Sequence, residues 1–303
     1  MADIYKKNDS IKVKFMKAAT VKHASTGTKK KMTTTFNRLE AFAKKQRYGA
    51  LEPTSMTARQ MKNYVEYLTD ELKLNPRSIQ NETSHIRRAL EAVDREAFAQ
   101  NTCSNEALGV PIGTRIGSGK IVQEDVLQGA LERAPASTKA LIELSRSLGL
   151  RIREAVLSQN SLREWNRDLS KGQPIIVRDG TKGGRARSVV VAPGGLERAQ
   201  GAVKVSLAVL REQKTLVISV SLKAALEQHS DRLARLGLKK ENSCHSLRHA
   251  FAMDQYRHYL AVGCSEKVAL SRTSNDLGHG DRRGRWVYNN YLKASLEDIK
   301  ADY

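Results

Sequence analysis

The sequence has little cysteine and no long apolar run. Its 303 residues include three cysteines, Cys103, Cys244 and Cys264, and no CxxC pair. So sparse and odd a set argues against a disulfide framework and a structural zinc site, and favours a reducing cytoplasm. No stretch approaches ~18 consecutive apolar residues, which excludes a transmembrane helix. The N-terminus has no apolar run after its charges, so we expect no secretory signal.

Proline, glycine and internal repeats are also scarce. The chain has 6 prolines and 20 glycines, with no repeated unit and no long low-complexity tract. Neither residue is enriched, so the composition gives no sign of a repeat protein or a low-complexity segment. Hydrophobic residues make up 40% of the chain, which is enough for one large domain or two ordinary ones.

Acidic residues are too few to balance the basic ones. The 52 Lys and Arg outnumber the 32 Asp and Glu, which gives a net charge of +20. Residues 1–50 hold 13 basic and 3 acidic residues, and residues 151–250 hold 19 and 9. Two separate basic zones indicate two places that touch one anionic polymer. The alternative for residues 1–31 is a disordered basic tail.

Apolar periodicity predicts helices over most of the first third of the chain. Phe36, Leu39 and Phe42 recur about one turn apart within 33–48. Thr57-Ala-Arg-Gln60 has the form of a capping box, and Asn75-Pro76 has the form of a helix start. We therefore predict four segments: a basic N-terminal tail (1–30), a helical domain (31–105), a linker (106–121) and a second domain (122–303).

The second domain is predicted to be mainly α with a small antiparallel β-sheet. Pro135 separates two helical segments, and Gly149 stands where a C-terminal cap belongs. Two β-branched runs, 174–178 and 187–192, flank a turn-rich segment and predict a hairpin with an extended tip. Helices follow to the end of the chain, where Ala294–Tyr303 is expected to form a short C-terminal helix.

Arginine, lysine and histidine stand at positions suited to binding a phosphate. Arg151 begins a helix among apolar neighbours, and a buried guanidinium needs a planar anion as partner. Glu154 could orient it, although an i, i+3 pair of this kind is commonly structural. Lys182 lies on the Gly-flanked hairpin tip, where it can reach an anion and donate a proton. A solvated basic turn is the alternative.

Two further segments combine histidine with arginine or tyrosine. His245 and Arg248 lie on one helix face and pair a proton acceptor with a phosphate clamp. A metal site made of His245, His249 and Cys244 is disfavoured, because no further ligand motif accompanies it. His279 follows Leu-Gly, and Tyr288 lies nine residues later among arginines that favour its phenolate as a nucleophile. Alternatively, Tyr288 and Tyr291 are ordinary residues of an amphipathic helix, one of them in the core.

The candidate side chains follow one another in a fixed order: Arg151, Lys182, His245, Arg248, His279 and Tyr288. In this order, the chain resembles the tyrosine recombinase (phage integrase) family over about residues 120–292. The nine-residue step from His279 to Tyr288 and the HxLRHxFA form of residues 245–252 are the most specific parts of the resemblance. The resemblance implies a SAM-like helical core-binding domain followed by a mixed α/β catalytic domain.

The resemblance also implies a mechanism that needs no metal and no cofactor. Tyr288 would attack a DNA phosphodiester and leave a 3′-phosphotyrosine link. Arg151 and Arg248 would hold the phosphate oxygens, with Glu154 supporting Arg151. Lys182 would be the general acid. His245 would accept the phenol proton or hold the phosphate, and His279 would hydrogen-bond the phosphate.

The expected partner is double-stranded DNA in the cytoplasm, at the nucleoid, and no membrane is involved. The candidate DNA-contacting residues are Lys29, Lys30, Lys31, Arg185 and Arg187. Subunits are expected to form a tetramer on DNA, with a possible directionality factor or DNA-bending protein, and to integrate or excise a prophage or other mobile element. A type IB topoisomerase-like enzyme and a catalytically silent DNA-binding regulator are the alternatives.

Overall fold

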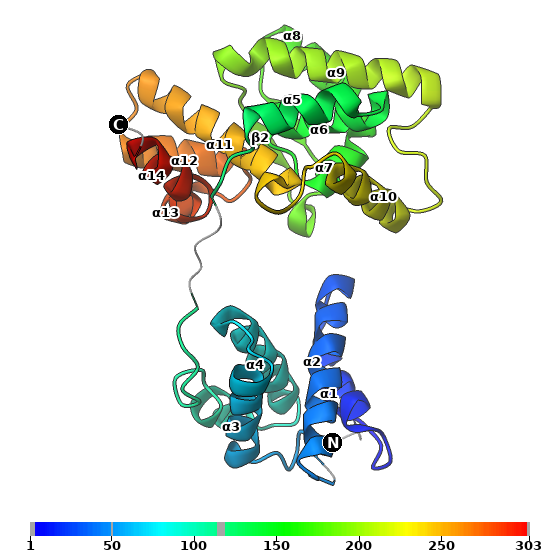
Figure 1. Cartoon of the computed structure of the whole chain (residues 1–303), viewed down its shortest axis with the longest axis vertical. Helices are drawn as coiled ribbons and strands as arrows, with labels where there is room; N and C mark the ends of the chain where they lie inside the picture. The colour runs from blue at the N-terminus through cyan, green and yellow to red at the C-terminus, as the bar shows by residue number, and fades with distance from the viewer. Residues whose placement is uncertain (1–3, 50, 114–118, 302–303) are drawn as a thin grey trace. The chain divides into compact units, whose positions relative to one another are not determined.

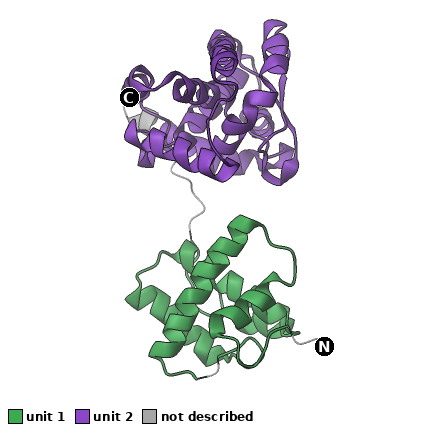
Figure 2. Cartoon of the chain, turned by 90° about the vertical axis from the view of Figure 1, so that its right-hand side faces the viewer, with its two compact units in different colours: residues 1–114 green, residues 115–303 purple. Residues whose placement is uncertain are grey.

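The computed structural model describes residues 4–49, 51–113 and 119–301, with side chains described as far as residue 297. The chain divides into two compact units, Met1–Thr114 and Arg115–Tyr303 (Figure 2). The boundary falls inside the predicted linker 106–121, of which residues 114–118 lie outside the described residues. The predicted fold class is confirmed: helices dominate the described residues, whose one sheet is a two-stranded antiparallel pair.

Unit 1 is all-helical, as the sequence predicts. Its α-helices are α1 (Ile11–Thr20), α2 (Thr26–Lys45), α3 (Ala58–Glu66) and α4 (Pro76–Glu91), with π-helical turns at Tyr67–Glu71 and Phe98–Thr102 (Figure 1). α1 packs against both α2 and α4. Their inward faces form one apolar core, in which Phe36, Leu39 and Phe42 are fully buried.

The predicted basic tail over 1–30 is largely replaced by structure. α1 and the first turn of α2 fall within it, and residues 1–3 lie outside the described residues. Phe15 is fully buried, and its ring centroid lies 5.6 Å from that of Phe36. Phe15, Ala18 and Ala19 form a narrow apolar stripe that α1 buries between its lysines. The sequence did not predict α1, because lysines interrupt the apolar residues of this stripe along the chain.

Side-chain caps begin α3 and α4 where the sequence predicts them. Thr57 accepts a hydrogen bond from the Gln60 amide at 3.2 Å, and the Gln60 side chain accepts one from the Thr57 amide at 2.8 Å. The predicted capping box of α3 is therefore confirmed. Asn75 caps α4 through the Ser78 amide at 2.9 Å, with Pro76 as the first helical residue.

Unit 2 surrounds its small sheet with helices. Its elements are α5 (Glu124–Arg133), α6 (Ala136–Leu148), α7 (Ile152–Leu157), α8 (Leu162–Ser170), β1 (Ile175–Val177), β2 (Arg187–Val189), α9 (Pro193–Gln213), α10 (Leu222–Arg235), α11 (Cys244–Ala261), α12 (Glu266–Asp276), α13 (Gly284–Val287) and α14 (Lys293–Ala301). A π-helical turn, η7 (Tyr288–Leu292), joins α13 to α14, and short 3-10 turns include η3 (Ser158–Asn160) and η4 (Lys182–Gly184).

Helix α6 is central to the helix packing of unit 2. It packs against α9 and against α11, and α11 packs in turn against α12. Figure 1 shows α12, α13 and α14 gathered beside α11. The predicted hairpin is present, shorter than expected, with Ile175 opposite Val189 and Val177 opposite Arg187. Gly149 ends α6 at φ +59°, as predicted, and an added Cβ there would stand 2.3 Å from the Phe251 ring.

The C-terminal segment forms the predicted helix, α14, and contacts its own unit. The Ser295 hydroxyl donates to the Gly119 carbonyl at 2.8 Å and accepts from the Ile121 amide at 3.2 Å. Residues 302–303 lie outside the described residues. None of the helices in the described part of the chain combines the length and apolar character needed to cross a membrane.

Candidate active site

The candidate site begins at the turn between α6 and α7. Gly149 ends α6, and Arg151 stands at the N-terminus of α7. The Glu154 carboxylate accepts hydrogen bonds from the Arg151 amide at 2.9 Å and from its Nη1 at 2.6 Å. The carboxylate therefore caps the helix and also fixes the guanidinium. The Arg151 side chain is 25% exposed, so one side of it remains open to a ligand.

Glu154 is fully buried and faces three guanidinium groups. Besides Arg151, Arg187 Nη2 lies 2.9 Å from its Oε2 and Arg248 Nη1 lies 3.8 Å from the same oxygen. Burial alone would raise the pKa of Glu154, but the positive charges of Arg187 and Arg248 and the Arg151 amide lower it to about 2. The carboxylate is therefore ionised at neutral pH.

Arg248 lies on α11 and is also fully buried. Its two terminal nitrogens donate to the main-chain carbonyls of Gly149 and Leu277, and Nε donates to the Tyr291 hydroxyl at 3.3 Å. Burial and the nearby Arg187 charge lower the pKa of Arg248 to about 10, so it remains a cation at neutral pH. Through these hydrogen bonds the Arg248 side chain connects the segment before α7 with the turn after α12.

Tyr291, and not Tyr288, reaches this cluster. Tyr291 is 2% exposed, and its hydroxyl lies 3.2 Å from His279 Nε2. Tyr288 instead lines a separate cavity beside α12 together with Glu266 and Lys267. Residues three apart in the η7 turn lie on different faces, so only one of the two tyrosines can face Arg248. The nine-residue spacing from His279 favours Tyr288, but it does not take into account the π-helical turn η7, in which Tyr291 and not Tyr288 faces Arg248.

The histidines around Tyr291 are neutral at pH 7. Burial, followed by nearby arginine charges, lowers the pKa of His279 to about 3. Burial and neighbouring cationic groups lower the pKa values of His245 and His249 to about 4. The His245 ring centroid lies 5.5 Å from that of Tyr291, and the His249 ring lies at 4.8 Å. A neutral imidazole beside a phenol can accept a hydrogen bond from its hydroxyl, and the negative charge of a bound phosphate would raise the pKa of the imidazole toward that of a general base.

His249 is occupied in the structure by a main-chain contact. Its Nδ1 lies 3.0 Å from the Lys120 carbonyl oxygen, before α5. Cys244 stands at the start of α11, one residue before His245. Within the described ranges, no group of three His, Cys, Asp or Glu residues lies close enough together to hold a metal ion.

Arg187 does not lie where a DNA contact was expected. Its side chain is 4% exposed and cannot touch a bound polymer at the surface, so this expectation is corrected. In β2 the residues alternate between the core and solvent, and Arg187 shares the inward face with Val189. That alternation in Arg187-Ser188-Val189 was visible in the sequence, and it was the signal that could have placed the arginine inside.

Lys182 and Arg185 are exposed at the hairpin tip. The structure does not bring them to the cluster, since no hydrogen bond or ion pair among the described residues joins either side chain to it. Lys29, Lys30 and Lys31 are exposed on the first turns of α2, in unit 1. These five residues are available to an external anion.

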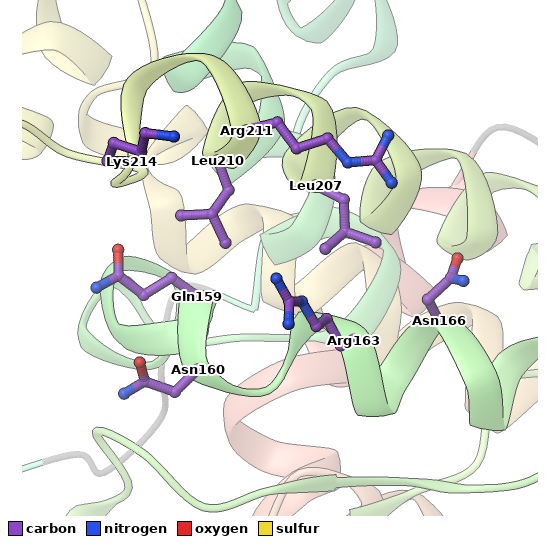
Figure 3. Close-up of a pocket in the computed structure, with 8 residues that line it drawn as sticks. All are labelled: Gln159, Asn160, Arg163, Asn166, Leu207, Leu210, Arg211 and Lys214. Atoms are coloured by element: carbon purple, nitrogen blue, oxygen red, sulfur yellow. The ribbon is translucent and has the colours of Figure 1, made fainter.

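A cavity of about 910 Å³ lies between α8 and α9, apart from the cluster (Figure 3). Figure 3 shows Leu207 and Leu210 on its α9 side and Arg163 extending from α8 into the space below them. None of the candidate site residues lines it. Helix α6 packs between α9 and α11, and so separates this cavity from the helix that carries Arg248.

Comparisons with known proteins agree with this architecture. Residues 109–254 match the family model described as Integrase, and residues 13–107 match the Phage integrase SAM-like domain. The first match ends before His279 and the two tyrosines. No curated protein matches the sequence.

Solved structures share the fold at low sequence identity. The Tn1549 transposon integrase in complex with transposon right end DNA is 14% identical, with a TM-score of 0.59 over 95% of this chain and 98% of that one. A lambda integrase tetramer bound to a Holliday junction is 19% identical, with a TM-score of 0.53 over 92% and 80%. The XerH site-specific recombinase bound to difH substrate is 16% identical, with a TM-score of 0.54 over 98% and 90%.

Proposed function

Because the chain belongs to the tyrosine recombinase (phage integrase) family, a family of site-specific recombinases, we propose that it cuts and rejoins double-stranded DNA through a 3′-phosphotyrosine intermediate. The observation that carries this proposal is the position of the Tyr291 hydroxyl. It lies 3.2 Å from His279 Nε2 and 3.3 Å from Arg248 Nε. A phenol placed between a neutral base and a buried cation is equipped to act as a nucleophile.

In the proposed reaction, Tyr291 Oη attacks the scissile phosphorus and gives its proton to His279 Nε2. The bond from phosphorus to the 5′ oxygen breaks, and the DNA 3′ phosphate remains linked to the tyrosine. Arg151 holds the non-bridging oxygens with its exposed face, since a guanidinium matches phosphate geometry. Arg248, which is fully buried, supplies positive charge from inside the protein. The low dielectric there strengthens the attraction between this charge and the phosphate.

The leaving 5′ oxygen needs a proton, and Lys182 is the proposed donor. The lysine lies at an exposed hairpin tip, and proton donation requires this tip to approach the cluster when DNA is bound. His245, at the start of α11, is proposed to bind the phosphate beside Arg248. Religation is the reverse attack, by a 5′ hydroxyl on the phosphotyrosine, and it requires no external energy source because the bond energy is retained. Joining to a different 5′ end gives recombination.

We propose prophage or other mobile-element DNA as the substrate, and assembly of four subunits on it. A directionality factor or a DNA-bending protein would complete the assembly. Lys29, Lys30 and Lys31 are proposed to contact phosphates from unit 1, and Arg185 from unit 2. Such contacts position the protein without reading sequence. The cytoplasm, at the nucleoid, is the proposed location.

The test is covalent capture on nicked duplexes of randomised sequence, analysed on denaturing gels. We expect Tyr291→Phe to form no adduct while it still binds duplex, because only the nucleophilic oxygen is removed. We expect Tyr288→Phe, the matched control three residues away, to form the adduct at the wild-type level.

The opposite pattern would restore Tyr288, which the sequence spacing favours, as the nucleophile. Duplex binding by the wild-type chain with no adduct on any sequence in the pool would overturn the proposed function and favour a silent DNA-binding regulator.

A further inference from the structure

Arg187 is a buried cation that the mechanism above does not use. Its side chain leaves β2 and meets segments from three other parts of unit 2. Nη2 donates to the Glu154 carboxylate at 2.9 Å and to the Gly149 carbonyl at 3.2 Å, and Nη1 donates to the Asp276 carbonyl. A fully buried guanidinium is costly, so its partners must compensate for its lost hydration.

Each segment that Arg187 touches carries a proposed catalytic residue. Gly149 and Glu154 flank Arg151, and Asp276 stands three residues before His279. The main-chain oxygen of Gly149 is also an acceptor for Arg248. Arg187 thus contacts the supports of three catalytic side chains without reaching the space that the substrate would occupy.

We propose that Arg187 is a positioning residue, which holds the Arg151 turn and the His279 turn in a single geometry through its hydrogen bonds to Glu154, Gly149 and Asp276. The inference rests on the proposed function, in that it assigns Arg187 a role in the same reaction. It also has a consequence for the charge of Glu154 that can be measured without the reaction.

Packing shows that the His279 turn is built around Arg187. Gly278, one residue before His279, has φ +70°, and an added Cβ there would lie 2.5 Å from the Arg187 Cδ. A glycine is therefore needed on two grounds, the backbone conformation and the arginine stem beside it. The stem and the turn fix each other's position.

The charges around Glu154 explain why Arg187 matters for its ionisation. One carboxylate faces Arg151 on its own helix, Arg248 on α11 and Arg187 on β2. The Asp276 carboxylate on α12 is held instead by Gln255 Nε2 at 3.0 Å and the Tyr259 hydroxyl at 2.8 Å. The other titratable neighbours of these arginines are three histidines and the Tyr291 hydroxyl, which accepts from Arg248 Nε. The pKa of His279 is lowered to about 3 and those of His245 and His249 to about 4, so all three are neutral at pH 7.

Removing Arg187 would leave Glu154 buried with less positive charge beside it. Arg187 is the largest of the influences that lower the pKa of this carboxyl, while burial raises it. In Arg187→Met the pKa of Glu154 therefore rises, and the carboxyl becomes protonated at a higher pH. A protonated Glu154 binds the Arg151 guanidinium more weakly, because the charge-assisted hydrogen bond at 2.6 Å is lost.

The experiment measures the single-turnover rate of adduct formation between pH 5 and 9 for Arg187→Met and Arg187→Lys. In Arg187→Met we expect the rate to fall about 100-fold at pH 7, since a misplacement of about 1 Å has such an effect. We also expect the acidic limb of the pH profile to move to higher pH. Arg187→Lys restores the charge but not the forked contacts, so the limb returns toward the wild-type position while the rate stays low.

Two further variants isolate the cause. In Arg187→Met/Glu154→Gln the displaced acidic limb should vanish, because no carboxyl remains to titrate. Arg185→Met, an exposed arginine on the same hairpin, should weaken duplex binding and leave the pH profile unchanged. A wild-type profile and rate in Arg187→Met would overturn the proposal.

A stability measurement separates failure of this proposal from failure of the proposed function. The pKa of Glu154 is about 2 in the folded wild type, below its ordinary value of 4.5. The ionised carboxylate therefore stabilises the folded state fully at pH values above 4.5, and this stabilisation is lost as the pH falls toward 2. The stability gap between wild type and Arg187→Met should therefore close as pH falls from 7 to 3. In the Glu154→Gln background the gap should depend much less on pH, because only the smaller influence of Arg187 on Asp276 and His279 remains. A pH-independent gap in both backgrounds refutes the role of Arg187 even if no adduct is ever found.

Discussion

At the scale of single residues, a buried polar group that has no hydrogen-bond partner lowers the stability of the folded state. His229 on α10 is 2% exposed, and its Nε2 has no hydrogen-bond partner among the described residues. Burial, followed by the Arg232 charge, lowers its pKa to about 4. The side chain is therefore held neutral, and its protonation opposes folding.

We predict that His229→Leu stabilises the protein, and increasingly so in acid. The folded-state pKa lies below the ordinary 6.5, so the unfolded chain binds a proton first and stability falls as pH drops from 6.5 toward 4. Removing the histidine should raise the free energy of unfolding by about 2–3 kcal/mol at pH 4, at 1.36 kcal/mol per pKa unit. Urea titrations at pH 4, 5 and 7 measure this difference.

The control is His23→Gln, at an exposed histidine in unit 1, which should leave the pH dependence unchanged. An equal stability difference between His229→Leu and the wild type at all three pH values would contradict the prediction.

Sequence order predicted several residues that the structure brings together, but it did not predict that Tyr291 contacts them or that Arg187 is buried beside them. Arg151, Arg248 and His279 could be inferred because each belongs to a short local motif, and the structure brings them together. Tyr288 and Tyr291 lie in the same short segment, and they differ only in the direction in which each side chain leaves the η7 turn. Arg187 was misassigned because a basic residue near a hairpin tip was expected to be solvated, while strand alternation turns it inward.

At the scale of secondary-structure elements, local signals were enough for α3 and α4, although a side-chain cap alone was not, since Ser10 also caps α1. The α3 capping box and the α4 start at Pro76 follow from residue types at fixed spacings, and both are present. α1 was missed because only four of its residues are buried, one of them Lys14, which pairs with Glu52 at 2.9 Å. A contact 38 residues away along the chain cannot be inferred from a local pattern.

We predict that Thr57→Ala lowers the free energy of unfolding by about 1 kcal/mol, the usual cost of losing a helix N-cap. The alanine leaves the Gln60 amide without its side-chain acceptor. Thermal or urea unfolding followed by circular dichroism measures the change. Thr57→Ser keeps the acceptor oxygen and should remain within about 0.5 kcal/mol of the wild type, as surface substitutions usually do. Equal losses in both variants would show that the capping hydroxyl is not what stabilises α3.

At the scale of the whole molecule, the chain has separate cores in its two units. The core of unit 1 includes Phe15, Phe36 and Leu90, and the main core of unit 2 includes Trp165 and Phe251. Residues 51–150 hold 12 basic and 13 acidic residues and cover part of each unit, so charge distribution alone did not place the boundary. Apolar periodicity over 31–105 did so more closely.

We predict that Phe36→Ala destabilises unit 1 alone. Truncating a fully buried phenylalanine costs about 3–5 kcal/mol, and the lost contacts all lie in the unit 1 core. Hydrogen exchange should show reduced protection across α1, α2 and α4, with α6 and α11 unchanged. A uniform loss of protection in both units would show that they unfold as one cooperative block. Phe251→Ala provides the reciprocal test in unit 2.

The anchors of the buried arginines are mostly main-chain oxygens. Arg248 binds the carbonyls of Gly149 and Leu277, and Arg187 binds those of Gly149 and Asp276. Every amino acid supplies the same carbonyl, so a substitution such as that of Leu277 by another apolar residue leaves these acceptors in place. Substitutions around the site are therefore expected to be tolerated where they keep the backbone path, whereas the path itself requires glycine at Gly149 and Gly278. The arginine framework can in this way persist while the surrounding sequence diverges.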